Sequence, residues 1–277
     1  MSIILTHDHF AKLERDSYII IHNFLSETER SEIAVAIRRI LPPWSDLEDK
    51  TKTSDAAYFP YKEQCLNRAI LNRECIRFAQ KWLGTKKIHY RPGLALVRYP
   101  GFKGYSNKPH MDNGNNSLLP PNELDQSHGQ LNFWFYPEDV AEDQAPTYLL
   151  KKSDGQDMGR AKKFVAPGGS LAIFTNYNWH SAGDYLRDDG QRYVWKFAYG
   201  RADHPWEGVL HYTNVGQSPH FRHFIGLLTP KEREFFRFPP VGHPYYTLQT
   251  LQALSKQYPG WDKKRIPEII WGECEVH

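Results

Sequence analysis

Between residues 88 and 200 the chain is divided into short runs of β-branched and aromatic residues, and Gly, Pro and Asn separate these runs. Short strands with turn residues between them are typical of a sandwich or barrel of antiparallel strands. The best candidates for strands are residues 94–99, 130–136, 147–150, 170–174 and 192–199. The pattern predicts a mainly β protein of the α+β class, with a jelly-roll core over about residues 88–200.

The part before this core, residues 1–87, is predicted to be mainly helical. A strand is expected over residues 18–25, because this run is β-branched and aromatic. A capping box that begins at Ser26 then starts a helix, which Pro42 ends. A second helix is expected over about residues 63–83, because its apolar residues recur at helical spacing.

No element is predicted over residues 44–61, which are polar and show no periodicity. The strand pattern ends after residue 200, and the extension over residues 201–277 is expected to be helical. One helix is predicted directly after Thr229, where Pro follows a capping residue, and another over residues 247–258. Since no linker is visible, we expect residues 1–277 to form a single domain.

Composition argues against several classes of protein. Of the 277 residues, 40% are hydrophobic, 24% charged and 14% aromatic, as in soluble globular enzymes. The net charge of +3 comes from scattered Lys and Arg, so no basic stripe predicts nucleic-acid binding. Three cysteines without metal or disulfide spacing favour a reducing compartment. Because there is neither a signal-peptide pattern nor an apolar run of roughly 20 residues, we expect a cytoplasmic protein without a membrane partner.

The candidate metal ligands begin with His110 and Asp112. If the backbone is extended here, both side chains point to the same face. An imidazole and a carboxylate form two thirds of the 2-His-1-carboxylate triad that binds Fe(II) in oxygenases and leaves positions for a co-substrate and O2. The third ligand has to come from another strand, and His180 fits because it follows the strand predicted at residues 170–174. A single His among 13 is more often structural, so the hypothesis rests on the whole set.

Arg192 is the candidate for binding the co-substrate, because its planar fork of donors suits a dicarboxylate such as 2-oxoglutarate. It opens a run with one aromatic face, made of Tyr193, Trp195, Phe197 and Tyr199. Arg192 and Lys196 therefore share the other face, and a core-facing Arg needs a partner. A bound carboxylate would be such a partner, and a structural salt bridge is the alternative. Arg187, which lies among acidic residues, is expected to be a solvated loop charge.

In this order the residues resemble the phytanoyl-CoA dioxygenase family of Fe(II)/2-oxoglutarate oxygenases, over about residues 10–200. The motifs that carry the resemblance are Asp16–Ser26, His110-x-Asp112, Trp134–Val140, and Pro167–Phe174 followed by His180 and Arg192. The resemblance implies a cupin-like double-stranded β-helix, with iron bound by His110, Asp112 and His180. It also implies that Arg192 binds the distal carboxylate of 2-oxoglutarate, that O2 is the second co-substrate, and that no catalytic group is needed beyond the metal centre.

The resemblance also bears on the reaction. In related halogenases a small residue replaces the carboxylate ligand, so Asp112 favours hydroxylation, or an oxidation that proceeds through it, with release of succinate and CO2. Polar residues around the His110-x-Asp112 pair favour a small, polar metabolite over an acyl chain. Relatives in this family act on amino acids and specialised metabolites. Residues 151–155 and Gly169-Ser170 depart from the family pattern, so the substrate is not inferred from these relatives.

Two other functions are compatible with the same residues. A cupin-like isomerase or a non-catalytic metal- or ligand-binding protein would use the His set without 2-oxoglutarate, and such a protein would not need Arg192. An oxygenase that acts on nucleic acid or protein is the second alternative, and the absence of a basic stripe argues against it.

Further contacts are predicted from position along the chain. Arg98, Asn132 and Trp134 lie on predicted strands near the ligands and are candidates for co-substrate binding. The candidates for substrate binding are Tyr105, Asn107, Lys108, Asn115, Asn116 and Tyr177. For Trp134 and Tyr177, packing in the core is the alternative. Residues 113–129 are rich in turn formers, which fits either a lid over the site or a solvated insertion.

Overall fold

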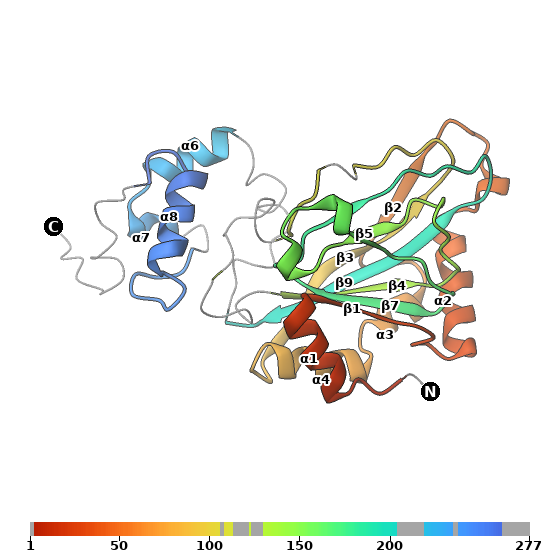
Figure 1. The fold of residues 1–277 in the computed structure, drawn as a ribbon, viewed down its shortest axis with the longest axis horizontal. Coiled ribbons are helices and arrows are strands. Elements are labelled where there is room, and N and C mark those ends of the chain that lie inside the picture. The colour runs from red at the N-terminus through yellow and green to blue at the C-terminus, as the bar shows by residue number, and fades with distance from the viewer. Residues whose placement is uncertain are drawn as a thin grey trace.

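A six-stranded antiparallel sheet lies at the centre of the molecule (Figure 1), with the strand order β1-β7-β4-β9-β3-β2. The structure is a computed structural model that describes residues 3–105, 108–112, 122, 130–203, 219–234 and 238–261. The strands of this large sheet are β1 (Tyr18–Ile21), β2 (Ser54–Tyr58), β3 (Ile88–Arg98), β4 (Gln130–Tyr136), β7 (Ser170–Thr175) and β9 (Arg192–Arg201).

A smaller antiparallel sheet has the order β6-β5-β8. Its strands are β5 (Thr147–Leu149), β6 (Lys162–Lys163) and β8 (His180–Ala182), and the 3-10 turns η2 (Lys152–Asp154) and η3 (Met158–Arg160) lie between β5 and β6. The two sheets face each other across a hydrophobic cluster that includes Leu149 of the small sheet, Phe164 directly after β6, and Phe174 and Val194 of the large sheet. The mainly β, antiparallel architecture and all five predicted strands are confirmed.

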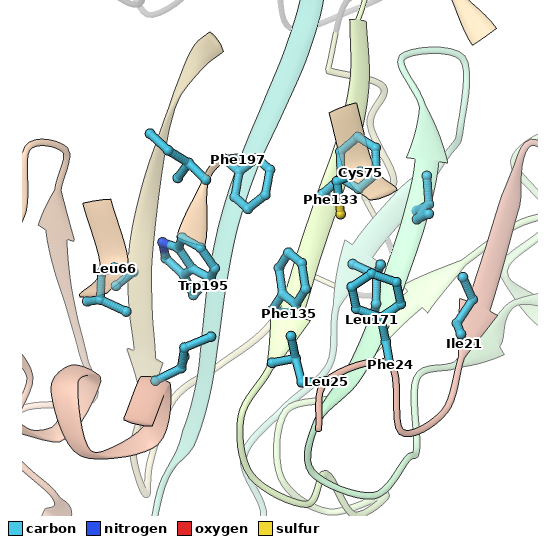
Figure 2. Close-up of a cluster of buried hydrophobic side chains, with 14 of the residues drawn as sticks. Ile21, Phe24, Leu25, Leu66, Cys75, Phe133, Phe135, Leu171, Trp195 and Phe197 are labelled. Carbon is cyan, nitrogen blue, oxygen red and sulfur yellow. The ribbon is translucent and has the colours of Figure 1, made fainter. Parts of the chain in front are cut away.

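The other face of the large sheet packs on the N-terminal helices. These helices are α1 (His7–Asp16), α2 (Glu27–Ile40), α3 (Gln64–Ala69) and α4 (Arg73–Trp82). Figure 2 shows Trp195 beside Leu66 of α3 and Phe133 beside Cys75 of α4, and all four side chains are fully buried. Side chains alternate along a strand, so Arg192 and Lys196 lie on the opposite face of β9 from Trp195 and point toward the small sheet. This face of the large sheet is called the inner face below.

The segment from residue 63 to residue 83 forms two helices, so the prediction of one helix is wrong. The amide oxygen of Asn72 accepts hydrogen bonds from the backbone N–H groups of Glu74 and Cys75, both at 3.1 Å. The first N–H groups of a helix have no backbone partner within that helix. The side-chain acceptor of Asn72 therefore favours the start of a second helix, α4, directly after it. The helix after Ser26 is confirmed, with the predicted capping box formed by Ser26 and Glu29.

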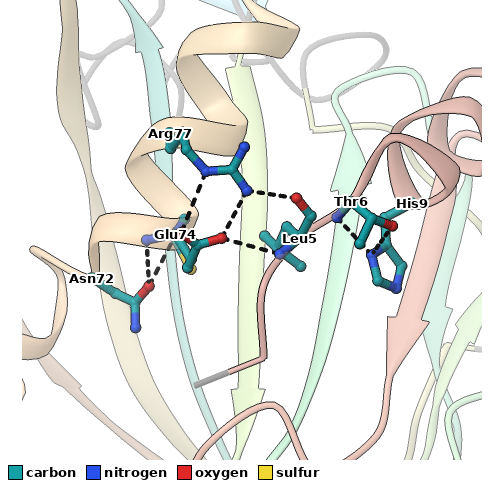
Figure 3. Close-up of polar contacts among 7 residues, drawn as sticks. Leu5, Thr6, His9, Asn72, Glu74 and Arg77 are labelled. Carbon is teal, nitrogen blue, oxygen red and sulfur yellow. Dashed lines mark hydrogen bonds and ion pairs between the residues drawn. The ribbon is translucent and has the colours of Figure 1, made fainter. Parts of the chain in front are cut away.

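Polar contacts fix the start of the chain on α4 (Figure 3). The carboxylate of Glu74 accepts a hydrogen bond from the backbone N–H of Leu5 at 3.0 Å, and Arg77 donates to the Leu5 carbonyl at 2.5 Å. The pair with Arg77 lowers the pKa of the Glu74 carboxyl group. One residue further on, the His9 side chain accepts from the Thr6 N–H at 3.0 Å and closes the first turn of α1. These contacts hold α1 and the adjoining β1 against α4.

Residues 44–61 contain two elements that were not predicted, the 3-10 turn η1 (Trp44–Asp46) and the edge strand β2. β2 pairs with β3 in antiparallel register, with Ser54 opposite Arg98. Four of its five residues are half-buried and one is exposed, so neither face differs clearly from the other. A strand of this kind has no apolar alternation, which is why the sequence does not reveal it.

The C-terminal part contains α6 (Pro219–Leu227), α7 (Pro230–Arg233) and α8 (Leu248–Gln257). The last two were predicted and α6 was not. The helices share their own hydrophobic cluster, which includes Ile225, Leu251 and Tyr258, and Figure 1 draws them to one side of the sheets. That the whole chain is one domain stays a prediction. None of the helices in the described ranges is long and apolar enough to cross a membrane.

Candidate metal centre

His110, Asp112 and His180 come together in the structure. One ligand atom from each residue lies within 4.8 Å of the other two. Asp112 Oδ1 is 3.8 Å from His110 Nε2 and 3.6 Å from His180 Nε2. These separations are longer than those between atoms that bind one ion at about 2.1 Å from the same side, so the three side chains would have to move closer together to bind an ion. Two imidazoles and one carboxylate on one side of an ion form the facial arrangement that leaves further positions open.

Strand pairing brings the two histidines together. His180 opens β8, and its backbone exchanges two hydrogen bonds of 3.0 Å with the backbone of His110, which adds to the edge of the small sheet. The two imidazole rings are consequently 4.3 Å apart. Asp112 lies two residues after His110 and reaches the same point. The geometry expected from the His-x-Asp spacing is present, and iron binding by these residues stays a prediction.

The His180 ring is held in place by the turn before it. Its Nδ1 is 3.1 Å from the carbonyl oxygen of Asn178, which leaves Nε2 directed toward Asp112. The Asn178 side chain fixes that turn, because it donates to the Leu150 carbonyl at 2.6 Å and to the Ser17 hydroxyl at 2.9 Å. A hydrogen bond on the distal ring nitrogen sets the tautomer and orientation of a metal-bound His.

Both imidazoles are neutral at ordinary pH. Burial and, to a smaller extent, the nearby His180 lower the pKa of His110 to about 4. Burial also lowers the pKa of His180, whose side chain is 2% exposed. A metal ion binds only the unprotonated ring, so the burial that disfavours the imidazolium prepares both side chains for a cation.

Two guanidinium groups lie on the inner face of the large sheet without a carboxylate partner in the described part of the chain. Arg192 is 2% exposed and donates one hydrogen bond, from Nη2 to the Ala145 carbonyl at 2.8 Å, while its Nε has none. Arg98 lies opposite Arg192 in the β3–β9 register, and its Cζ is 3.9 Å from the centre of the Phe102 ring. Burial lowers the pKa of Arg98 to about 10 and also lowers that of Arg192. The alternative of a structural salt bridge at Arg192 therefore finds no partner among the described residues.

Lys196 is a third cation in the same space, and the sequence reasoning did not single it out as a site residue. Its Nζ is 4.3 Å from the centre of the Trp134 ring, and Trp134 stands edge-on to His180 at 5.6 Å between ring centres. Burial lowers the pKa of Lys196 to about 8. The signal that could have found it is the alternation along β9, which puts Lys196 on the same face as Arg192.

The remaining predicted contacts fall into three groups. Asn132 is 5% exposed on the inner face of β4, and its Nδ2 makes no hydrogen bond. The ring of Tyr105 is 5.7 Å from that of His110. Tyr177 instead donates its hydroxyl hydrogen to the Asn122 carbonyl at 2.8 Å. Lys108 is exposed. Residues 107, 115 and 116, together with the predicted lid over residues 113–129 apart from residue 122, lie outside the described residues.

Arg187 behaves as the sequence predicted. It is exposed and pairs with Asp143 at 2.9 Å. Asn122 also joins two parts of the molecule, because its side-chain amide donates to the Tyr245 carbonyl at 3.0 Å in the C-terminal part.

Comparison with known protein families finds no match, and comparison with curated proteins finds none either. Solved structures share the fold. HygX from Streptomyces hygroscopicus, with nickel and 2-oxoglutarate bound, superposes with a TM-score of 0.56 at 13% identity, over 72% of this chain and 88% of that chain.

Two further solved structures are similar. SnoN, a non-heme alpha-ketoglutarate-dependent epimerase from nogalamycin biosynthesis, gives a TM-score of 0.52 at 16% identity, over 69% of this chain and 81% of that chain. EctD from S. alaskensis gives a TM-score of 0.54 at 12% identity, over 72% and 78%. At these identities the likeness establishes a shared fold, and this fold is one that iron- and 2-oxoglutarate-dependent enzymes use.

Proposed function

We propose that this protein is an Fe(II)- and 2-oxoglutarate-dependent dioxygenase that hydroxylates or otherwise oxidises a small, polar metabolite. The observation that carries the proposal is a pair of features. His110, Asp112 and His180 offer three ligand atoms to one ion, and Arg192, on the inner face of the large sheet, is buried with no carboxylate partner among the described residues. A metal-bound dicarboxylate satisfies both features at once.

We infer further that the two sheets are the halves of a double-stranded β-helix. Successive segments alternate between the sheets: β3 is in the large sheet, the His110 segment in the small one, β4 in the large, β5 and β6 in the small, β7 in the large, β8 in the small, and β9 in the large. This alternation supports a jelly roll. The metal ligands then belong to two adjoining segments of the small sheet, and Arg192 belongs to the last strand of the large sheet.

The side chains described above fit both iron and 2-oxoglutarate, the two groups that this function needs. Neutral imidazoles and a carboxylate suit Fe(II), and the open side of the triad leaves room for a chelating keto acid and O2. The free Nε of Arg192 and the fork of Arg98 can hold the distal carboxylate of 2-oxoglutarate, and the unpaired Nδ2 of Asn132 is a further donor on the same face. When bound, iron and 2-oxoglutarate supply the oxidation of the substrate by O2, with succinate and CO2 as co-products.

The protein's own residues provide binding and orientation. Asn178 sets the ring of His180, strand pairing sets His110, and the aromatic rings of Trp134 and Phe174 lie beside His180 at 5.6 and 5.0 Å between ring centres. Apolar walls of this kind limit the access of water to the ion, which favours reaction with the substrate over side reactions.

A cupin-like isomerase or a non-catalytic metal-binding protein is the alternative. Such a protein has no use for a buried guanidinium without an anion, because an uncompensated buried charge is unfavourable. Arg192 therefore favours the oxygenase.

An anaerobic titration tests the proposal. Fe(II) and then 2-oxoglutarate are added to the protein, and the visible charge-transfer band of the chelate is recorded. We expect a band in the parent protein, no band in Asp112→Ala, and a much weaker affinity for 2-oxoglutarate in Arg192→Ala. Arg187→Ala is the matched control, because it removes an exposed Arg of the same region of sequence and should leave the band intact. A parent protein without the band would refute the proposed function.

A further inference from the structure

We propose that Lys196 binds a carboxylate of the oxidised substrate, so that this enzyme acts on a negatively charged metabolite. The inference rests on the proposed function and narrows its substrate class. The observation that carries it is the ammonium group of Lys196, which belongs to a half-buried side chain, lies over the ring of Trp134 next to His180, and has no ion pair or hydrogen bond with a described residue.

The position of Lys196 is fixed by two strand pairings. It lies opposite Trp134 in the β4–β9 register, on the inner face of the large sheet, and its Nζ is 4.3 Å from the centre of the Trp134 ring. The same indole stands edge-on to His180. The ammonium group is therefore level with the metal ligands, where a substrate has to present the carbon that is oxidised.

Lys196 has no partner of opposite charge among the described residues. It makes no hydrogen bond or ion pair with any of them, and its ammonium group lies over the face of Trp134. While burial lowers the pKa of Lys196, the negative charge of Asp112 raises it. The carboxylate of Asp112, however, already lies between the two imidazoles. A cation–π contact leaves the positive charge of this half-buried side chain without a counter-charge, so the site favours an additional anion.

The charges of the cofactors do not supply that anion. With iron and 2-oxoglutarate bound, Asp112 and one carboxylate of the co-substrate would balance the two positive charges of Fe(II). Arg192 would balance the distal carboxylate, and Arg98, opposite Arg192 in the β3–β9 register, adds a second guanidinium. Lys196 remains as a further positive charge among the described residues that line this space.

Distance also separates Lys196 from the distal end of 2-oxoglutarate. Arg192 and Lys196 are four residues apart on β9, which corresponds to about 13 Å along an extended strand. A co-substrate held by Arg192 would lie at that end of β9, whereas Lys196 lies beside the Trp134–His180 pair. The anion that meets Lys196 is therefore one that approaches the metal beside the co-substrate, as the substrate does.

The test uses small anions as probes and does not require the natural substrate. The anaerobic complex with Fe(II) and saturating 2-oxoglutarate is titrated with acetate and propionate, and with acetamide and propionamide as uncharged matches. The readout is a shift of the charge-transfer band. Loss of the band would instead report displacement of 2-oxoglutarate, so the two events are distinguishable in one spectrum.

Three proteins are compared: the parent, Lys196→Met and Lys196→Arg. We expect carboxylates, but not amides, to shift the band of the parent. Lys196→Met should bind them about tenfold more weakly or worse, because a charged hydrogen bond is lost. Lys196→Arg should keep the response, since it keeps the charge. In all three proteins the affinity for 2-oxoglutarate should stay within about threefold, a difference below that of one hydrogen bond to a charged group.

Several results would overturn the proposal. Carboxylates that shift the band of the parent and of Lys196→Met equally, or that shift neither, would exclude a role for Lys196 in binding anions. A large loss of 2-oxoglutarate affinity in Lys196→Met would assign the residue to the co-substrate. Absence of the band in the parent protein is a different outcome, because it refutes the proposed function itself.

Discussion

Replacing Arg192 by Met separates a ligand-binding Arg from a structural one. Met is unbranched and apolar, so it can fill much of the space of the Arg side chain without its charge. Arg192 is 2% exposed, holds one hydrogen bond to the Ala145 carbonyl, and faces Arg98 across the strand pair. In the absence of 2-oxoglutarate, this charge is buried without an anion. Such a charge lowers the free energy of unfolding by roughly 3 to 5 kcal/mol, even after the surrounding structure relaxes.

The expected change in stability is a difference between two effects. Loss of the hydrogen bond to Ala145 destabilises by about 1.5 to 3 kcal/mol, because a charged donor makes it. Removal of the buried charge outweighs this, so Arg192→Met should stabilise the protein without 2-oxoglutarate by about 1 to 2 kcal/mol. For a chain of this size that corresponds to a rise in Tm of about 2 to 4 °C.

Thermal unfolding with and without 2-oxoglutarate, under anaerobic conditions with Fe(II), measures both consequences. At about 100 times its Kd, 2-oxoglutarate should stabilise the parent by about 2.7 kcal/mol, or about 5 °C, and should leave Arg192→Met unchanged. Arg187→Met is the control, since that exposed side chain should alter neither value by more than about 0.5 kcal/mol. A variant that loses stability and still responds to 2-oxoglutarate would refute the reasoning.

Three further predictions concern the fold and the ligands. Asn72→Ala should lower the free energy of unfolding in urea by about 1 kcal/mol through loss of the α4 cap, and Asn72→Asp should retain most of it. Phe135→Ala should cost about 3 to 5 kcal/mol in the same assay, and a loss below 1 would contradict its burial against the helices. Burial lowers the pKa of His110 from 6.5 to about 4, so the unfolded state binds more protons between these values. The metal-free protein is therefore fully stabilised above pH 6.5 and should lose up to about 3 kcal/mol on acidification to pH 4, and His110→Asn should flatten this pH profile.

The core strands and the two faces of β9 could be predicted from the sequence. Alternation is a local property of an extended backbone, so the aromatic residues that include Trp195 and Phe197 had to share one face and Arg192 had to lie on the other. The structure buries the aromatic face under the helices. Elements without a clear local signal were not predicted correctly. β2 was missed, and α3 and α4 were merged into one helix, because the start of α4 depends on the single side chain of Asn72.

By itself the sequence determined which residues could serve as ligands, because the His-x-Asp spacing, the later His180 and the strand-borne Arg192 are properties of short segments. Only the tertiary structure decided that these segments meet. The pairing of His110 with His180, and of Trp134 with Lys196, depends on hydrogen bonds between strands that are distant in sequence. Local propensity does not encode which strands pair, since loop closure and burial of the whole core select the register. For this reason the ammonium group of Lys196 beside the predicted metal ligands became evident only in the folded chain.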